Sequence, residues 1–238
     1  MYILSLDSTA VAATVALCED ERLLALTTVE NGNTHSQTLL PLVESTLAHF
    51  DLHPHDMGIL ACSVGPGSFT GVRIGTSTVK GLGFGTDIPC IGVSTLEALA
   101  YNLIGFDGLI CPVMNARRNQ VYNALFECRD GNLTRLCDDR AIALADLDNE
   151  LVERNTSPVY LVGDGYELAH AQLTKSAALL RKTPAMLRPQ NAYSVAQIAL
   201  TLYRQGVRTT DAELSPVYLR PCQAERERME RLAAEQKN

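Results

Sequence analysis

The sequence predicts an α/β fold built from two tandem units. Three short strand patterns open the chain in close succession, and strand and helix patterns then alternate, which is typical of an α/β layer fold. The second half repeats this order of elements. The 238 residues, 46% hydrophobic and 20% charged, suffice for one large domain or two small ones. We therefore expect units at residues 1–106 and 107–221, and a charged tail at 222–238 that is helical or disordered.

The first unit begins with a predicted antiparallel meander, because turn residues separate strand patterns at 2–6, 12–17 and 23–29. Apolar positions then recur with a helical period, which predicts an amphipathic helix within residues 36–50. The continuous apolar run at 58–64 predicts a strand that is covered on both faces.

A Gly-Pro-Gly loop leads from this strand into a predicted helix at residues 69–84. A short strand at 90–93 and a helix capped by Ser94 or Thr95 complete the first unit.

The second unit also begins with strand patterns and continues with helices. The expected strands are residues 109–114, 121–127, 133–137 and 159–162. The expected helices are residues 145–154, 166–173 and 193–204.

The net charge of −7 comes entirely from the first half of the chain. Residues 1–105 carry three basic and ten acidic side chains, whereas residues 106–238 carry seventeen of each. A chain that binds nucleic acid by itself needs a Lys/Arg surface to neutralise phosphates. We therefore expect any contact with RNA to require a partner.

The patterns of secreted and membrane proteins are missing. The longest stretch without acidic or basic residues, 57–72, is shorter than the roughly 20 residues of a membrane span. The first residues lack a basic leader. The seven cysteines are an odd number without close pairs, which disfavours disulfides and zinc sites. We expect a cytoplasmic protein with free thiols that does not bind membranes.

Two segments have the composition of a phosphate-binding site. A hairpin tip of small polar residues can direct backbone N–H groups at an anion, and its carboxylate can hold a metal ion through water, although the same residues form ordinary turns. A glycine loop between an apolar strand and a helix also presents converging N–H groups. Neither a Walker A nor a dinucleotide-binding pattern is present. The candidate residues are Asp7, Ser8, Thr9, Gly65, Pro66, Gly67, Ser68, Gly71 and Arg73.

Small residues recur on one side of the helix at 69–84, at Ser77, Gly81 and Gly85. Glycine inside a helix costs about 1 kcal/mol relative to alanine, so this stripe indicates the close approach of another backbone. Packing within the chain and packing against a partner are both consistent with it.

Histidines and nucleophiles form no recognisable catalytic set. A helical metal site at His35 would need a second ligand one turn later, where Leu39 stands. We expect His49, His53 and His55 to lie on the surface, because a helix end followed by a proline loop does not predict a metal cage. No nucleophile elbow is present.

Six motifs together resemble the bacterial TsaB (YeaZ) family over nearly the full length of the chain. They are Ile3-Leu4-Ser5-Leu6-Asp7-Ser8-Thr9, His35-Ser36 followed by Leu39-Leu40-Pro41, Gly65-Pro66-Gly67-Ser68-Phe69-Thr70-Gly71-Val72-Arg73-Ile74-Gly75, Asn115-Ala116-Arg117-Arg118 with Val121-Tyr122, Gly163-Asp164-Gly165, and Pro216-Val217-Tyr218-Leu219-Arg220. The family often has Asp at the position of Asn115.

The resemblance implies an actin-like fold, as in Hsp70 and hexokinase ATPases. It also implies a role in forming N6-threonylcarbamoyladenosine beside the anticodon of tRNAs that read ANN codons. The chain would be a non-catalytic subunit that pairs with a TsaD-type catalytic subunit, with a TsaE-type ATPase as third member. It would form a homodimer when alone and contact tRNA only through the complex.

The same resemblance implies an interface formed by the first two helices. The implied contact residues are His35, Leu39, Leu42, Val43, Leu47, Ile74, Thr78, Gly81 and Leu82. No cofactor is required of this chain, and weak or vestigial ATP or ADP binding at the Asp7 turn and the glycine loop stays open.

Two enzyme functions are the alternatives. An active ATP-dependent small-molecule kinase or ATPase of the same fold would use the Asp7 turn and the glycine loop for phosphates. A metallopeptidase is disfavoured, because the chain has no H-E-x-x-H pattern.

Overall fold

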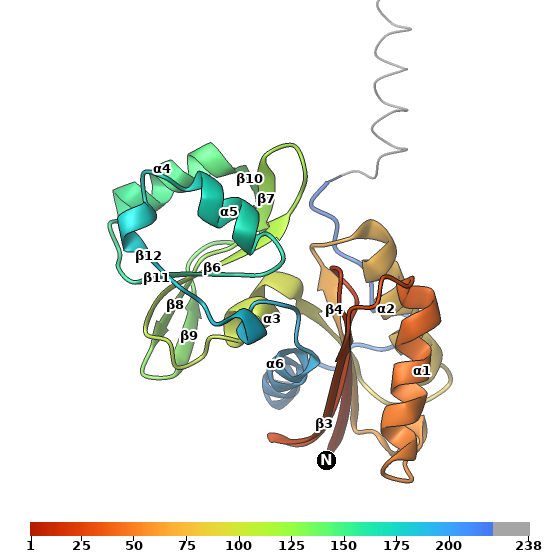
Figure 1. The fold of residues 1–238 in the computed structure, drawn as a ribbon. Coiled ribbons are helices and arrows are strands. Elements are labelled where there is room, and N and C mark those ends of the chain that lie inside the picture. The colour runs from red at the N-terminus through yellow and green to blue at the C-terminus, as the bar shows by residue number, and fades with distance from the viewer. Residues whose placement is uncertain (221–238) are drawn as a thin grey trace, which may run out of the picture.

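The computed structural model describes residues 1–220, which form two β-sheets with helices packed on their faces (Figure 1). The tail expected at 222–238 lies outside the described residues. Within the described part of the chain, no helix combines the length and the apolar character that crossing a bilayer requires.

The first sheet has five strands in the order β3-β2-β1-β4-β5. Their bounds are Tyr2–Asp7 (β1), Ala13–Glu19 (β2), Arg22–Val29 (β3), Ile59–Gly65 (β4) and Cys90–Ser94 (β5). β1, β2 and β3 pair antiparallel, whereas β4 pairs parallel with both β1 and β5. The predicted meander and the strand after it are therefore confirmed.

Helices cover both faces of this sheet. α1 (His35–Ala48) and α2 (Phe69–Gly83) pack on one face, and α3 (Thr95–Tyr101) and α6 (Ala192–Arg204) pack on the other. Every residue of β4 is buried between these layers, as its continuous apolar run predicts.

The second sheet contains the order β10-β7-β6-β11-β12, with β8 paired to β6 and β9 paired to β8. The strands are Gly108–Asn115 (β6), Gln120–Asn123 (β7), Phe126–Arg129 (β8), Asn132–Arg135 (β9), Arg140–Ala143 (β10), Val159–Val162 (β11) and Leu180–Arg181 (β12). The helices α4 (Leu144–Arg154) and α5 (Tyr166–Gln172) pack against it. The short 3-10 turns are Pro54–Asp56 (η1), Ala177–Leu179 (η2) and Ala185–Leu187 (η3).

The single strand predicted at 121–127 is wrong, because the chain forms two strands there. β7 pairs with the end of β6 and β8 with its beginning. Between these pairings lies Pro112 of β6, which has no N–H to donate to a neighbouring strand. The buried Asn123 side chain instead donates hydrogen bonds to the carbonyl oxygens of Pro112 (2.9 Å) and Ala124 (3.0 Å).

The chain returns to the first sheet after the second, which corrects the expected unit at 107–221. α6 packs on the first sheet, where Ser5 Oγ donates a 2.7 Å hydrogen bond to the Ala192 carbonyl. Cys90 N donates to the Thr209 carbonyl (2.8 Å), and Leu214 belongs to the core beneath α1 and α2. The apolar second face of the first sheet needs this cover, because burying it in protein is favourable.

Both units begin with antiparallel strands and continue with strand–helix alternation. The fold is therefore the actin-like α/β fold.

Candidate functional site

A cleft opens where the two units meet, with a cavity of about 550 Å³. Five chain segments line it. They contribute Thr9, Ala10 and Val11, then Pro66, Gly67, Ser68, Phe69 and Thr70, then Met114, Asn115, Ala116, Arg117 and Tyr122, then Asp164, and finally Val217, Tyr218, Leu219 and Arg220. The volume is within the range of about 300–1,000 Å³ that small-molecule sites occupy.

Asp7 is buried beneath the first hairpin, and hydrogen bonds occupy both of its carboxylate oxygens. The backbone N–H and the hydroxyl of Thr9 each donate to Oδ1 at 2.7 Å, and Ser63 Oγ donates to Oδ2 at 2.5 Å. Burial raises the pKa of Asp7, while the bonds from Ser63 and Thr9 oppose that rise. The carboxylate joins β1 to β4 and to the hairpin tip, so the residues present do not fit a role for Asp7 as a metal ligand.

The glycine loop packs tightly against the first hairpin. Ser68 N donates a 2.7 Å hydrogen bond to the Thr9 carbonyl, and a Cβ built on Gly71 would overlap the Ser8 carbonyl oxygen. The Ser68 side chain caps α2 by accepting from Gly71 N at 3.3 Å. Of the predicted phosphate residues, Thr9, Pro66, Gly67 and Ser68 line the cavity, whereas Asp7, Ser8, Gly65, Gly71 and Arg73 do not.

Arg73 does not line the cavity itself but contacts two aromatic side chains that do, Phe69 and Tyr218. Its guanidinium lies 3.8 Å from the centre of the Phe69 ring, and its Nε donates to the Tyr218 hydroxyl at 2.8 Å. The Phe69 and Tyr218 rings are 4.7 Å apart, and Val217 N donates to the Val64 carbonyl at 2.7 Å. Arg73 thus fastens the segment that ends at Arg220 to the start of α2, instead of facing the cavity.

The second hairpin faces the first across the cleft. Asn115 Oδ1 accepts a 2.8 Å hydrogen bond from Arg117 N, which shapes the hairpin tip. An Arg220 Nη1 hydrogen bond to the Ala116 carbonyl (2.9 Å) ties the end of the described chain to this hairpin. Asn115 therefore has a structural use that does not need the charge of an aspartate.

Asp164 is the carboxylate among the cavity-lining residues, and sequence reasoning did not predict it as a site residue. Although it is solvent-exposed, neighbouring protein atoms displace enough water to raise the pKa of its carboxyl to about 6, and the negative charge of Asp7 adds to that rise. Backbone N–H groups of Asn115 and Gly165 act in the opposite direction. The Gly163-Asp164-Gly165 motif was the available signal, because glycines let the chain turn closely beside β6.

The residues implied for the interface divide between the core and the surface of α1 and α2. Leu39, Val43 and Leu47 are at most 4% exposed and belong to the core against the first sheet, so their assignment to an interface is wrong. The sheet needs an apolar cover, and α1 provides it with this stripe.

The remaining implied residues stay nearer the surface. Leu42, Ile74, Thr78 and Leu82 are partly buried, and Gly81 is exposed. His35 is also partly buried, with Nε2 2.7 Å from the Ala10 carbonyl, so it connects α1 to the first hairpin. Leu40, which the interface prediction omitted, is 45% exposed.

Comparisons with known proteins give a consistent identification. The family model described as "TsaD: tRNA N6-adenosine threonylcarbamoyltransferase" matches residues 30–227. The chain is similar to the tRNA threonylcarbamoyladenosine biosynthesis protein TsaB of Bacillus subtilis, at 37% identity over 73% of this chain and 75% of the relative. It is also similar to TsaB of Escherichia coli, at 30% identity over 92% of this chain and 95% of the relative.

The solved structure of YeaZ from Pseudomonas aeruginosa has the same fold. It superposes with a TM-score of 0.72 at 23% identity, over 92% of this chain and 99% of that chain. The fold, the matching family model and the curated relatives agree, and the chain belongs to the TsaB (YeaZ) family of tRNA threonylcarbamoyladenosine biosynthesis proteins.

Proposed function

We propose that this chain is a non-catalytic subunit that pairs with a TsaD-type catalytic subunit through the outer surface of α1 and α2. The complex would form the threonylcarbamoyl group on adenosine beside the anticodon of tRNAs reading ANN codons. A TsaE-type ATPase would be its third member, and tRNA would bind only to the complex. The chain would form a homodimer alone and would require no cofactor of its own.

The observation that carries this proposal is Gly81 in α2. The residue is exposed, and a Cβ built on it meets no atom within 4 Å. Glycine within a helix costs about 1 kcal/mol relative to alanine, and no neighbour in the described chain requires its small size. A partner backbone that packs directly on α2 would account for it.

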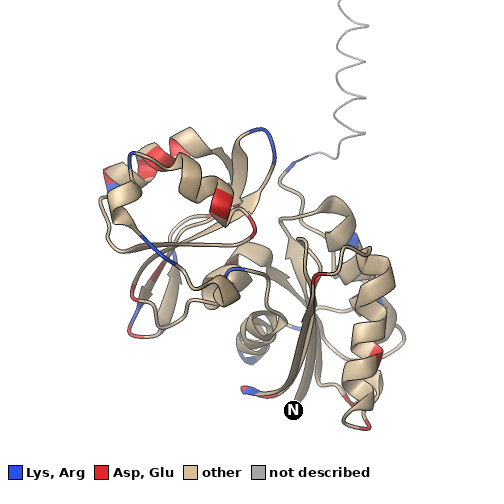
Figure 2. Cartoon of the chain, viewed as in Figure 1, with Lys and Arg blue, Asp and Glu red and all other residues tan. Residues whose placement is uncertain are grey.

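The low charge of α1 and α2 supports the same interpretation. Their 29 residues include three charged side chains, Glu44, Arg73 and Lys80, whereas the 11 residues of α4 include Asp146, Asp148, Glu150, Glu153 and Arg154. Figure 2 shows the difference between α1 and α4. Buried centres of protein interfaces are depleted in charged residues, so the surface of α1 and α2 is better suited to a partner than that of α4.

Size-exclusion chromatography with light scattering tests the pairing. The chain is mixed with the H-x-x-x-H relative from its own organism, and we expect a 1:1 complex that consumes the separate homo-oligomers. Two unchanged peaks would contradict the proposal.

Gly81→Leu locates the contact. Leucine is a better helix former than glycine, so the fold should keep its stability while the added side chain blocks the partner. Complex formation should fall at least tenfold. The matched control is Ala145→Leu, at another exposed helical position, on α4, which should leave the complex intact.

Nucleotide assays distinguish the kinase alternative. The isolated chain should not turn over Mg-ATP, and the threonylcarbamoyl transfer should need the catalytic partner. Saturable Mg-ATP turnover by the isolated chain would favour the kinase or ATPase function instead.

A further inference from the structure

The turn between α1 and β4 brings three potential metal ligands together. The ligand atoms of His53, His55 and Asp56 all lie within 4.8 Å of one another. A helix end followed by a proline loop does not by itself predict a metal cage around these histidines. The structure nevertheless places their donor atoms close together.

The backbone of this turn is ordered by its own hydrogen bonds. Pro54 occupies the first position of η1, where its fixed φ suits the turn and its missing N–H is not needed. Asp56 N donates to the His53 carbonyl at 3.0 Å, and His53 N donates to Asp56 Oδ2 at 2.8 Å. The histidines therefore project from a closed turn, with ring centres 5.3 Å apart and planes inclined by 21°.

From this arrangement we propose that His53, His55 and Asp56 bind one divalent transition-metal ion of the zinc class. Two imidazoles and a carboxylate are a donor set that Zn²⁺ accepts, with bonds of about 2.0–2.2 Å. His53 Nδ1 is 3.9 Å from Asp56 Oδ2, and His55 Nε2 is 3.7 Å from Asp56 Oδ1. Small rotations of these exposed side chains bring all three donors onto one ion, and its fourth position is left to water.

The charge around the turn favours a cation. Residues 44–60 include Glu44, Asp51 and Asp56 but no Lys or Arg, and such an excess of negative charge raises the local concentration of cations.

The cysteines of residues 1–220 are poor competitors for the ion. Cys18, Cys62, Cys90, Cys111 and Cys128 are buried, and Cys137 is partly buried. Burial raises the pKa of Cys111 to about 12 and that of Cys90 to about 11, which disfavours the thiolate form in which a cysteine binds zinc. Cys222, outside the described residues, is removed from the test by working in a Cys222→Ser background.

Calorimetric titration of the chelator-treated full chain with ZnCl₂ tests the site. We expect one ion per chain, and at least a tenfold loss of affinity in the double variant His53→Asn/His55→Gln. Asp56→Asn should also weaken binding. His49→Gln is the matched control, because His49 is an exposed histidine nearby that lies outside the cluster, and its affinity should equal that of the parent.

Substitution of Co²⁺ for Zn²⁺ identifies the ligands. Nitrogen and oxygen ligation should give d–d absorption without a thiolate charge-transfer band, and the bands should disappear in the double variant. Three results would each overturn the proposal: no saturable binding by the parent, equal affinity of parent and double variant, or a thiolate band. Because all three residues are exposed, the variants should keep the circular dichroism spectrum of the parent.

Discussion

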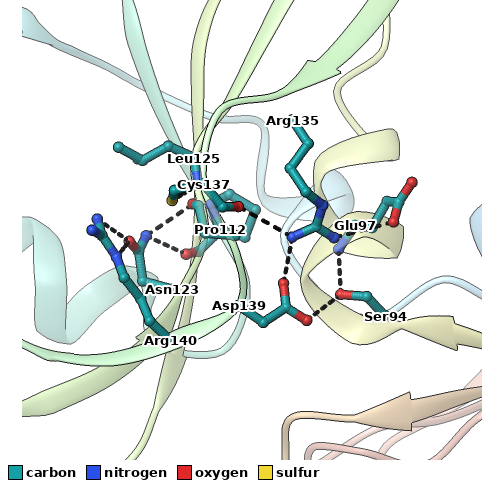
Figure 3. A network of polar contacts seen from close by, with 10 residues as sticks. Ser94, Glu97, Pro112, Asn123, Leu125, Arg135, Cys137, Asp139 and Arg140 are labelled. Carbon is teal, nitrogen blue, oxygen red and sulfur yellow. Dashed lines mark hydrogen bonds and ion pairs between the residues drawn. The ribbon is translucent and has the colours of Figure 1, made fainter.

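Arg135 Nη2 lies 3.1 Å from Glu97 Oε2, and this ion pair joins α3 to the β8–β9 hairpin of the second sheet. The other guanidinium nitrogen, Nη1, is 2.6 Å from Asp139 Oδ1, and Ser94 Oγ donates to Asp139 Oδ2 at 2.6 Å. Figure 3 shows the four side chains converging at this junction. The network links the N-terminus of α3 to the second sheet.

Arg135→Met should lower the free energy of unfolding by about 1–2 kcal/mol. The substitution leaves Glu97 and the mostly buried Asp139 without their cation. The expected loss of stability lies between that for an exposed ion pair and that for a buried one. Urea unfolding measures it. The control is Arg129→Met, whose pair with Glu127 is exposed and should contribute little. Equal losses in the two variants would show that the junction has no special role.

Gly71→Ala and Gly81→Ala should have opposite effects on stability, although both lie in α2. The Gly71 methyl group would overlap the Ser8 carbonyl, so the hairpin or the helix must move and stability should fall by about 2 kcal/mol or more. Gly81→Ala meets open space and should gain up to about 1 kcal/mol from helix propensity. Thermal unfolding of the two variants tests this contrast, and a loss in both would refute it.

Leu39→Ala should destabilise the chain by about 2–5 kcal/mol, because the side chain is 1% exposed and fills the core beneath α1. Its neighbour Leu40 is 45% exposed, so Leu40→Ala should change the free energy of unfolding by less than about 0.5 kcal/mol. Chemical denaturation compares the two. If the proposed pairing is correct, Leu40→Ala should still weaken the complex.

Asp164 should make stability fall as the pH rises from about 4 to about 6. Its folded-state pKa of about 6 is above the ordinary value of 3.8, so in this window the folded chain holds a proton that the unfolded chain has lost. Asp164→Asn removes this pH-dependent loss of stability, because the amide does not titrate. After allowance for solvent screening, the variant should be more stable than the parent by about 1 kcal/mol at pH 7 and equally stable below pH 4.

Urea unfolding at several pH values checks the Asp164 prediction. The stability difference between variant and parent should grow with pH up to about 6 and then stay constant. A difference that does not change with pH would show that the substitution acts through packing instead of through charge.

Local patterns were enough to predict most elements of the fold. Turn residues between closely spaced strand patterns marked the meander, a helical period marked α1, and a continuous apolar run marked β4, because each depends on neighbours within a few residues. The strand at 121–127 failed because its break depends on Pro112, a residue of the partner strand. The interface prediction failed at Leu39, since helical periodicity alone does not say which of the neighbouring residues Leu39 and Leu40 faces the sheet and which faces solvent.

By itself, the sequence determined most of the secondary structure, the repeated order of elements and the motifs that mark the family. The tertiary structure alone decided that α6 returns to the first sheet, that Thr9 and Ser63 donate hydrogen bonds to Asp7, and that His53, His55 and Asp56 converge. The physical reason is range. Backbone propensity and hydrophobic period act between near neighbours, whereas burial, charge and ligand geometry depend on atoms that only the folded chain brings together.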